Sequence, residues 1–125
     1  MSLKTLISIV ESSMHPNYSD FYLKNGLQET RVNSIRKAIS LIKKQPVDYL
    51  IAEFFYQYNT NYSGVQKSNL DVLLISLNKY SPNTKMIVLV TKEEHQYVSV
   101  LNDLNFPLQA ILVHPVGPDQ VKSCF

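Results

Sequence analysis

At 125 residues and 45% hydrophobic content, the chain has the size and apolar content of one domain with its own core, which needs no disulfide or metal. A formal charge of +2 is too close to neutral to require nucleic acid, and a single cysteine, Cys124, excludes a disulfide framework and a cysteine-based zinc site. No apolar run approaches the about 20 residues that span a bilayer, and Leu6–Val10 is too short for a signal peptide, which predicts a soluble, cytoplasmic, single-domain protein (1–125).

Short apolar runs and amphipathic patterns alternate along the first half of the chain. Leu6–Val10 is a bounded apolar run that predicts a buried strand, and a short helix is expected from Ser19 to about Gly26. Arg31–Val32 and their neighbours form a weaker and more polar strand candidate, as at a sheet edge. Ser34 then caps a helix that ends before Pro46, with an apolar face at i, i+3, i+4 and i+7: Ile35, Ala38, Ile39 and Ile42.

The alternation continues after this helix. Tyr49–Phe55 predicts a central strand, and a polar loop, Tyr56–Ser68, follows it. Asn69 is expected to cap the next helix, whose apolar face has the same spacing: Leu70, Leu73, Leu74 and Leu77. Met86–Val90 is a continuous apolar run, which is typical of a strand covered on both faces.

The last part of the chain predicts one more helix and one more strand. Thr91 is expected to cap a helix that ends at 105–107, with Tyr97, Val100, Leu101 and Leu104 on its apolar face. Ala110–Val113 is the fifth strand, and Val116–Phe125 leaves room for only a short fifth helix. Five apolar strands that alternate with helices predict a three-layer α/β fold, a parallel sheet with helices on both faces.

The order and spacing of these elements resemble a response-regulator receiver domain, the flavodoxin-like switch of two-component signalling. Gly26–Asp48 follows the family's glycine–strand–helix–proline–aspartate spacing, and Pro46–Glu53 resembles the approach to its phosphoacceptor strand end. Val88–Thr91 is similar to the fourth strand with its terminal switch threonine, and His114-Pro115 to the Lys-Pro pair after the fifth strand. The resemblance covers nearly the whole chain and implies the strand order 2-1-3-4-5.

The resemblance also identifies the positions of the phosphoacceptor site: Glu11, Ser12, Glu53, Thr91 and His114. Glu53 stands where the family has its phosphoacceptor Asp, and its extra methylene displaces the attacking oxygen by on the order of 1 Å. Ser12 replaces one acid of the metal-binding pair, and His114 replaces a lysine with an imidazole that is mostly neutral at pH 7. These departures imply a degenerate receiver, or pseudo-receiver, with no catalytic residues and no enzymatic activity.

Two other functions stay open at this point. One is a receiver that still takes a phosphoryl group within a phosphorelay, and the other is a flavodoxin-like protein that binds a small molecule at the strand ends. A further hypothesis is that Glu53 mimics a phosphorylated Asp by reaching toward Thr91. Only three Gly occur in the chain, so neither a P-loop nor a dinucleotide fingerprint is present.

No resident cofactor or metal is expected. Glu11 and Glu53 leave at most a residual, weak site for a divalent cation such as Mg²⁺. The alternative is that both acids remain from an ancestral site and are solvated or hydrogen-bonded to hydroxyl groups. His15, His95 and His114 have no metal-ligand spacing.

Two sequence features indicate protein contacts, with another signalling protein or with a second copy of the chain. Five cations and no acid lie between Thr30 and Val47: Arg31, Arg36, Lys37, Lys43 and Lys44. They form either a solvated helix face or a docking surface for an acidic partner, and without interleaved aromatics they do not indicate nucleic acid. Tyr56, Tyr58 and Tyr62 lie in a loop that either contacts a partner or covers the degenerate site. The sequence also allows that the chain is a fragment of a longer regulator.

Overall fold

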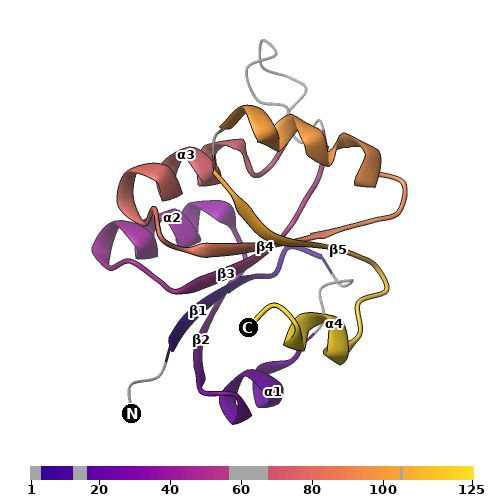
Figure 1. Ribbon diagram of the computed structural model, residues 1–125. Helices are drawn as coiled ribbons and strands as arrows, with labels where there is room; N and C mark the ends of the chain where they lie inside the picture. Colours follow the sequence, from indigo (N-terminus) through magenta and orange to yellow (C-terminus); the bar gives the residue numbers. More distant parts are fainter. Residues whose placement is uncertain (1–3, 13–16, 57–67, 105) are drawn as a thin grey trace.

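The computed structural model describes residues 4–12, 17–56, 68–104 and 106–125, which form a three-layer α/β structure around one parallel sheet (Figure 1). Its five strands are β1 (Lys4–Ile9), β2 (Leu27–Val32), β3 (Tyr49–Glu53), β4 (Lys85–Val90) and β5 (Leu108–Val113). They lie in the order β2-β1-β3-β4-β5, and every neighbouring pair is parallel. The fold class and the strand order expected from the sequence are therefore confirmed.

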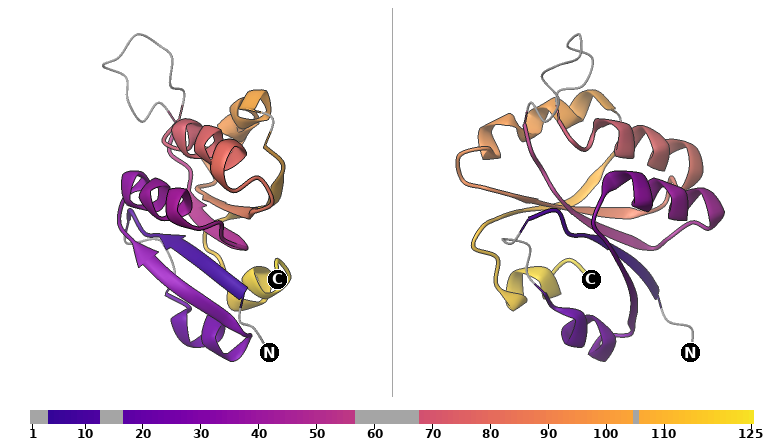
Figure 2. Two further views of the ribbon diagram at one scale, coloured as in Figure 1. Left: turned by 90° about the vertical axis from the view of Figure 1, so that its left-hand side faces the viewer. Right: turned by 180° about the vertical axis from the view of Figure 1, so that it is seen from behind.

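Helices cover both faces of the sheet (Figures 1 and 2). One face carries α2 (Ile35–Lys44), α3 (Asp71–Tyr80) and the 3₁₀ helix η1 (His95–Leu104). The opposite face carries α1 (Ser19–Lys24) and α4 (Pro118–Lys122), and α4 is short, as the sequence predicts. Within the described ranges, no helix is long and apolar enough to cross a membrane.

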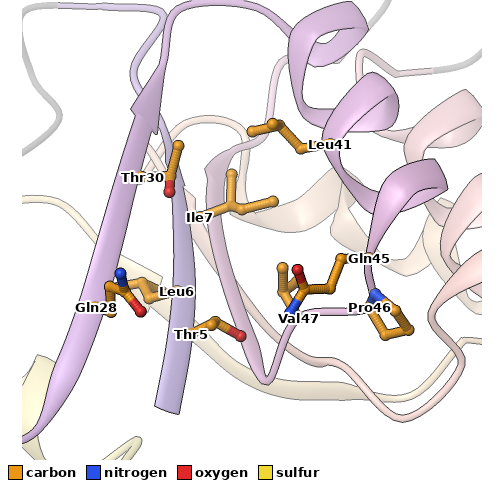
Figure 3. A pocket seen from close by; sticks show the side chains of 9 residues that line it. All are labelled: Thr5, Leu6, Ile7, Gln28, Thr30, Leu41, Gln45, Pro46 and Val47. Carbon is orange, nitrogen blue, oxygen red and sulfur yellow. The ribbon is translucent and has the colours of Figure 1, made fainter. Parts of the chain in front are cut away.

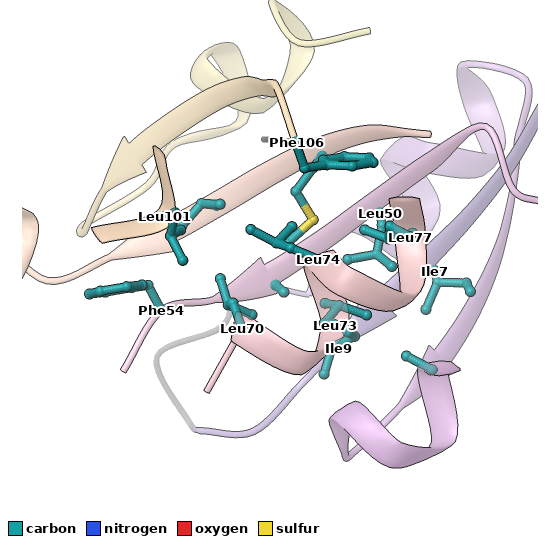
Figure 4. Close-up of a cluster of buried hydrophobic side chains, with 14 of the residues drawn as sticks. Ile7, Ile9, Leu50, Phe54, Leu70, Leu73, Leu74, Leu77, Leu101 and Phe106 are labelled. Carbon is teal, nitrogen blue, oxygen red and sulfur yellow. The ribbon is translucent and has the colours of Figure 1, made fainter. Parts of the chain in front are cut away.

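The core lies on both faces of the central strands. All five residues of β3 are buried, and so are the last five residues of β4. Under α2, α3 and η1 the buried side chains form one cluster (Figure 4), which includes Ile7, Leu50, Leu73, Leu74 and Leu77. A second cluster lies under α1 and α4 and includes Leu6, Tyr22, Ile51, Leu89 and Val121. Because both faces are covered, these strands are continuous apolar runs in the sequence.

Helix α2 begins and faces the sheet as its sequence predicts. The Ser34 hydroxyl accepts a hydrogen bond from the Lys37 amide at 3.2 Å, which is an N-cap. Ala38 and Ile42 on its apolar face are fully buried. Gly26, just after α1, has a φ of +75°, the left-handed conformation that glycine adopts without strain.

The prediction that Asn69 caps α3 is wrong. The helix begins at Asp71 after Leu70, and no side chain caps it at Leu70. The Ser68 hydroxyl instead accepts a hydrogen bond from the Leu70 amide at 3.1 Å and donates one to Asp71 at 2.6 Å. The Asn69 side chain is thereby free to point toward the strand ends.

The helix predicted after Thr91 is present, but as a 3₁₀ helix. With 3.0 residues per turn, residues three apart share a face, so Val98 and Leu101 are buried together. Tyr97, which the α-helical spacing places on the apolar face, is 38% exposed. The change from 3.6 to 3.0 residues per turn therefore turns this ring toward the surface.

Candidate functional site at the strand ends

The candidate site lies where the parallel strands end. β1 is followed by Glu11 and Ser12, β3 ends at Glu53, β4 is followed by Thr91, and β5 by His114. The register aligns these ends, with Ile9 paired to Ala52 and Val90 to Val113. Open α/β sheets place ligand-binding residues at this carboxyl edge, so the five predicted positions share one region of the fold.

Glu53 is enclosed at the end of β3. Only 2% of the residue is exposed, and its Oε1 atom accepts a hydrogen bond from the Ser12 hydroxyl at 2.7 Å. The Oε2 atom is buried and has no hydrogen-bond partner within the described ranges. Burial raises the pKa of Glu53, the Ser12 hydrogen bond opposes this rise, and the nearby charge of Glu11 adds to it.

Asn69 connects the two carboxylate-bearing segments. Its Nδ2 atom donates to the Glu53 carbonyl at 2.7 Å and to Glu11 Oε1 at 3.1 Å. Its Oδ1 atom accepts from the Phe55 amide at 2.6 Å, so all of these contacts come from one side chain that is 6% exposed. Burial raises the pKa of Glu11, and the hydrogen bond from Asn69 partly opposes that rise.

The sequence alone does not indicate this role of Asn69. An Asn that directly precedes a run of helical spacing has the pattern of an N-cap, and the cap is a local interaction. The observed contacts reach residues 14, 16 and 58 positions away in the chain, and no local pattern indicates them.

Thr91 contacts its own loop and makes no hydrogen bond with Glu53 in the described part of the chain. Its Oγ1 atom accepts from the Glu94 amide at 3.2 Å in the turn that precedes η1. Because η1 begins at His95, Thr91 is not the residue directly before the helix, and the predicted cap at Thr91 is wrong. The contact that mimicry of a phosphorylated Asp requires is therefore not present between the two described side chains.

His114 is held at the end of β5 by its backbone. Its amide donates to the Val90 carbonyl at 2.9 Å, and the peptide bond to Pro115 is cis. Partial burial lowers the pKa of His114, which favours the neutral imidazole. This group is therefore a poor substitute for the positive charge of a lysine.

Tyr56 joins the loop after β3 to the loop after β4. Its ring stacks on Tyr97 with centroids 4.1 Å apart and an interplanar angle of 7°. Its amide donates to Glu94 Oε2 at 2.5 Å, and its backbone pairs with Ser68 in an isolated antiparallel bridge. The other two aromatic positions singled out in the sequence, Tyr58 and Tyr62, lie outside the described residues.

The two basic positions singled out for an interface, Arg36 and Lys37, are exposed in the first turn of α2. Lys37 lines an open hollow of about 360 Å³ together with Val10, Arg31, Val32 and Asn33. The side chains are therefore free to contact a partner.

A separate cavity of about 230 Å³ lies beneath the C-terminal end of α2, near the start of β1 and β2 (Figure 3). Its lining has no titratable side chain and consists of Thr5, Leu6, Ile7, Gln28, Thr30, Leu41, Gln45, Pro46 and Val47. The cavity lies away from the strand-end residues. It therefore does not provide the ligand-binding crevice that a flavodoxin-like binder requires there.

The described residues contain no cluster of three or more His, Cys, Asp or Glu side chains that could hold a metal ion. Glu11 and Glu53 are the two acidic side chains at the strand ends, and Asn69 and Ser12 already occupy one oxygen of each. A hard cation prefers six or more oxygen ligands, several of them charged, so this pair alone fits a divalent cation poorly.

Comparison with known proteins identifies the fold. No family model matches the sequence, and no curated protein matches it. Among solved structures, a response regulator receiver domain protein from Methanospirillum hungatei superposes with a TM-score of 0.71 at 13% identity, over 98% of this chain and 90% of that one.

Two further solved structures give similar values. A DNA-binding response regulator of the LuxR family from Staphylococcus aureus has a TM-score of 0.70 at 14% identity, over 98% of this chain and 95% of that one. A structure described as an adenylate cyclase from Rhodopirellula baltica has a TM-score of 0.68 at 14% identity, over 97% and 83%. With its five parallel strands in the order 2-1-3-4-5, this chain has the fold of response-regulator receiver domains.

Proposed function

We propose that this chain is a receiver-like module of two-component signalling that acts through contacts with another protein and takes no phosphoryl group at Glu53. The observation that carries the proposal is the enclosure of the Glu53 carboxylate, 2% exposed and bonded to Ser12. A nucleophile must reach the incoming phosphorus atom. The Glu53 carboxylate is not exposed, and its side chain is one methylene longer than the aspartate that receiver domains have at this position.

The charges around Glu53 support the same proposal. Transfer of a phosphoryl group requires cations that neutralise its oxygens as they approach. Here Ser12 stands in place of a metal-binding acid, and His114 is favoured in its neutral form. The buried carboxylate of Glu53 and the half-buried carboxylate of Glu11 instead give an approaching phosphodonor two groups that repel it when ionised.

The remaining function of such a module is recognition. We propose that the chain works in the cytoplasm as one domain, with a separate signalling protein as its partner. A homodimer is the alternative partner arrangement, and nucleic acid and membrane are not proposed as partners, because the net charge is only +2.

An NMR titration with Mg²⁺ and then beryllofluoride, a mimic of the phosphoryl group, tests this proposal. We expect the amide signals near Glu11, Glu53 and Thr91 to stay unchanged, because no cation or phosphoryl mimic has a site there. Saturable shifts confined to these residues would contradict the proposal and favour a phosphorylatable receiver. Saturable shifts with a small organic ligand that co-purifies with the protein would favour the flavodoxin-like binder.

A further inference from the structure

Helix α2 carries two positively charged side chains at positions where they destabilise the helix. Arg36 and Lys37 occupy its first turn, which contains no acidic residue. The N-terminus of a helix has a partial positive charge, so cations in the first turn are destabilising and acids are stabilising there. Lys43 and Lys44 in the last turn agree with the helix dipole, so only the first pair requires another explanation.

No carboxylate within the described ranges neutralises these cations. The one ion pair in this part of the structure joins Arg31 to Glu29 at 3.6 Å. Arg36, Lys37, Lys43 and Lys44 are exposed and form no ion pair there. At about 100° per residue, the four project within an arc of about 120° on the side of the helix opposite the core.

Two exposed apolar side chains lie on the neighbouring helix. Ile75 is 57% exposed and Val72 is 40% exposed on α3. The inner faces of α2 and α3 pack into the same core cluster, so their outer faces point to the same side of the molecule (Figures 1 and 2). The Lys43 Nζ atom lies 5.7 Å from the centroid of the Tyr80 ring, which links the C-terminal ends of the two helices.

We propose that these outer faces form a docking surface for an acidic amphipathic helix of a partner protein. The surface, here the α2–α3 face, consists of Arg36, Lys37, Lys43, Lys44, Val72 and Ile75. Such a helix matches both parts of the surface, with carboxylates for the cations and apolar side chains for Val72 and Ile75. This inference rests on the proposed function, a module that acts by protein contact.

The chemistry of the surface favours a protein over a polyanion. Outside the basic run from Arg31 to Lys44, the chain has seven Lys and Arg against ten Asp and Glu, which disfavours a long polyanion. The apolar side of α2 packs against the core, so it is not available to enter a membrane. Exposed Val72 and Ile75 add apolar surface to this face, and an amphipathic helix offers them apolar contacts that nucleic acid and lipid headgroups do not.

Binding of a labelled model peptide, followed by fluorescence anisotropy, tests the proposal. The probe is a helical peptide with Leu at i, i+3 and i+7 and Glu on the flanking positions, compared with a scrambled peptide of equal composition. We expect the patterned peptide to bind more tightly than the scrambled one, and added salt to weaken the binding. In the double variant Arg36→Glu/Lys37→Glu, the affinity should fall about tenfold.

This double variant separates binding from folding. Acids in the first turn favour the helix, and Glu at 37 with Ser34 completes a capping box, so its melting temperature should be equal or higher. Ile75→Ser should also weaken binding. The matched control Lys24→Glu/Lys122→Glu makes the same charge change on α1 and α4, across the sheet, and should leave the affinity unchanged.

Three outcomes would overturn the inference. They are equal binding of both peptides, an equal loss of affinity in the control variant, and tighter binding of duplex DNA or phosphatidylserine vesicles than of the patterned peptide through Arg36 and Lys37. None of these bears on Glu53. A failure here is therefore distinct from the detection of phosphorylation, which would instead overturn the proposed function.

Discussion

Glu53 is an ionisable side chain enclosed at the end of a sheet, and burial raises its pKa above the ordinary value of 4.5. Burial raises the pKa of Glu11 as well. A carboxyl group with a higher pKa in the folded than in the unfolded protein contributes most to stability when it is protonated. This contribution is complete below about pH 4.5 and is lost as the pH rises through the raised value.

We therefore expect the variant Glu53→Gln to lose less stability than the native chain as the pH rises above about 4.5, because its side chain does not ionise. Urea unfolding at several pH values measures this difference. Glu93→Gln, at an exposed position in the loop before η1, is the matched control and should follow the native profile. An unaltered pH profile in Glu53→Gln would contradict the enclosure of this carboxylate.

Asn69 is the second residue on which the site depends. Asn69→Ala removes the side-chain hydrogen bonds to the Phe55 amide and to the Glu53 carbonyl, and we expect a loss of about 2 kcal/mol of unfolding free energy. Asn69→Asp keeps the acceptor for Phe55 but adds a carboxylate beside Glu11, so its loss should be larger at neutral than at acidic pH. Equal losses for Asn69→Asp at both pH values would contradict this geometry.

At the scale of elements, α3 has one face buried in the core and one face exposed to solvent. Leu74 is fully buried and its neighbour Ile75 is 57% exposed. Leu74→Ala should therefore cost about 2–5 kcal/mol, because it leaves a cavity between α3 and the sheet. Ile75→Ala should change stability by less than about 0.5 kcal/mol. Chemical denaturation of both variants compares them, and similar losses would contradict the orientation of α3.

The stack of Tyr56 on Tyr97 connects two loops at the strand ends. A double-mutant cycle with Tyr56→Ala and Tyr97→Ala should give a coupling energy of about 0.5–1.5 kcal/mol, as for other aromatic pairs. The measurement is the unfolding free energy of the two single variants and the double variant. Additive losses would mean that the rings do not interact in solution.

Sequence patterns predicted the elements more completely than they predicted the contacts between loops. The apolar faces of α2 and α3 and the continuous runs of β3 and β4 could be read directly, because burial imposes a period on the sequence. The 3₁₀ form of η1 could not, because the spacing of Val98 and Leu101 fits both kinds of helix. Because the sequence pattern was interpreted as an α-helix, Tyr97 was predicted on the apolar face, whereas its ring lies toward the surface.

The residues that the resemblance indicated lie together at one edge of the sheet, and their role as a functional site stays a prediction, but the sequence did not predict the contacts between them. The resemblance supplied Glu11, Ser12, Glu53, Thr91 and His114, and the fold brings them to one edge of the sheet. The hydrogen bonds of Asn69 and the stack of Tyr56 depend on how loops distant in sequence meet. Such contacts leave no periodic pattern, so a single sequence does not reveal them.

At the scale of the whole molecule, aromatic side chains pack together beside the short helix α4 and the C-terminal residue. Edge-to-face contacts link Tyr18 to Phe21, Phe21 to Tyr22, Tyr22 to Phe125, and Phe125 to Tyr49, with centroids 4.7–6.5 Å apart. These rings join α1, α4 and the sheet on the face opposite α2 and α3. The described residues therefore cover both faces of the sheet, as the receiver fold requires.

The central claim is that this receiver fold takes no phosphoryl group at Glu53. The most direct test is the intact mass of the purified protein after incubation with Mg²⁺ and acetyl phosphate, beside a competent receiver domain as positive control. We predict an unchanged mass for this protein while the control gains a phosphoryl group. A phosphoryl adduct that disappears in Glu53→Ala would contradict the claim and make the chain a working member of a phosphorelay.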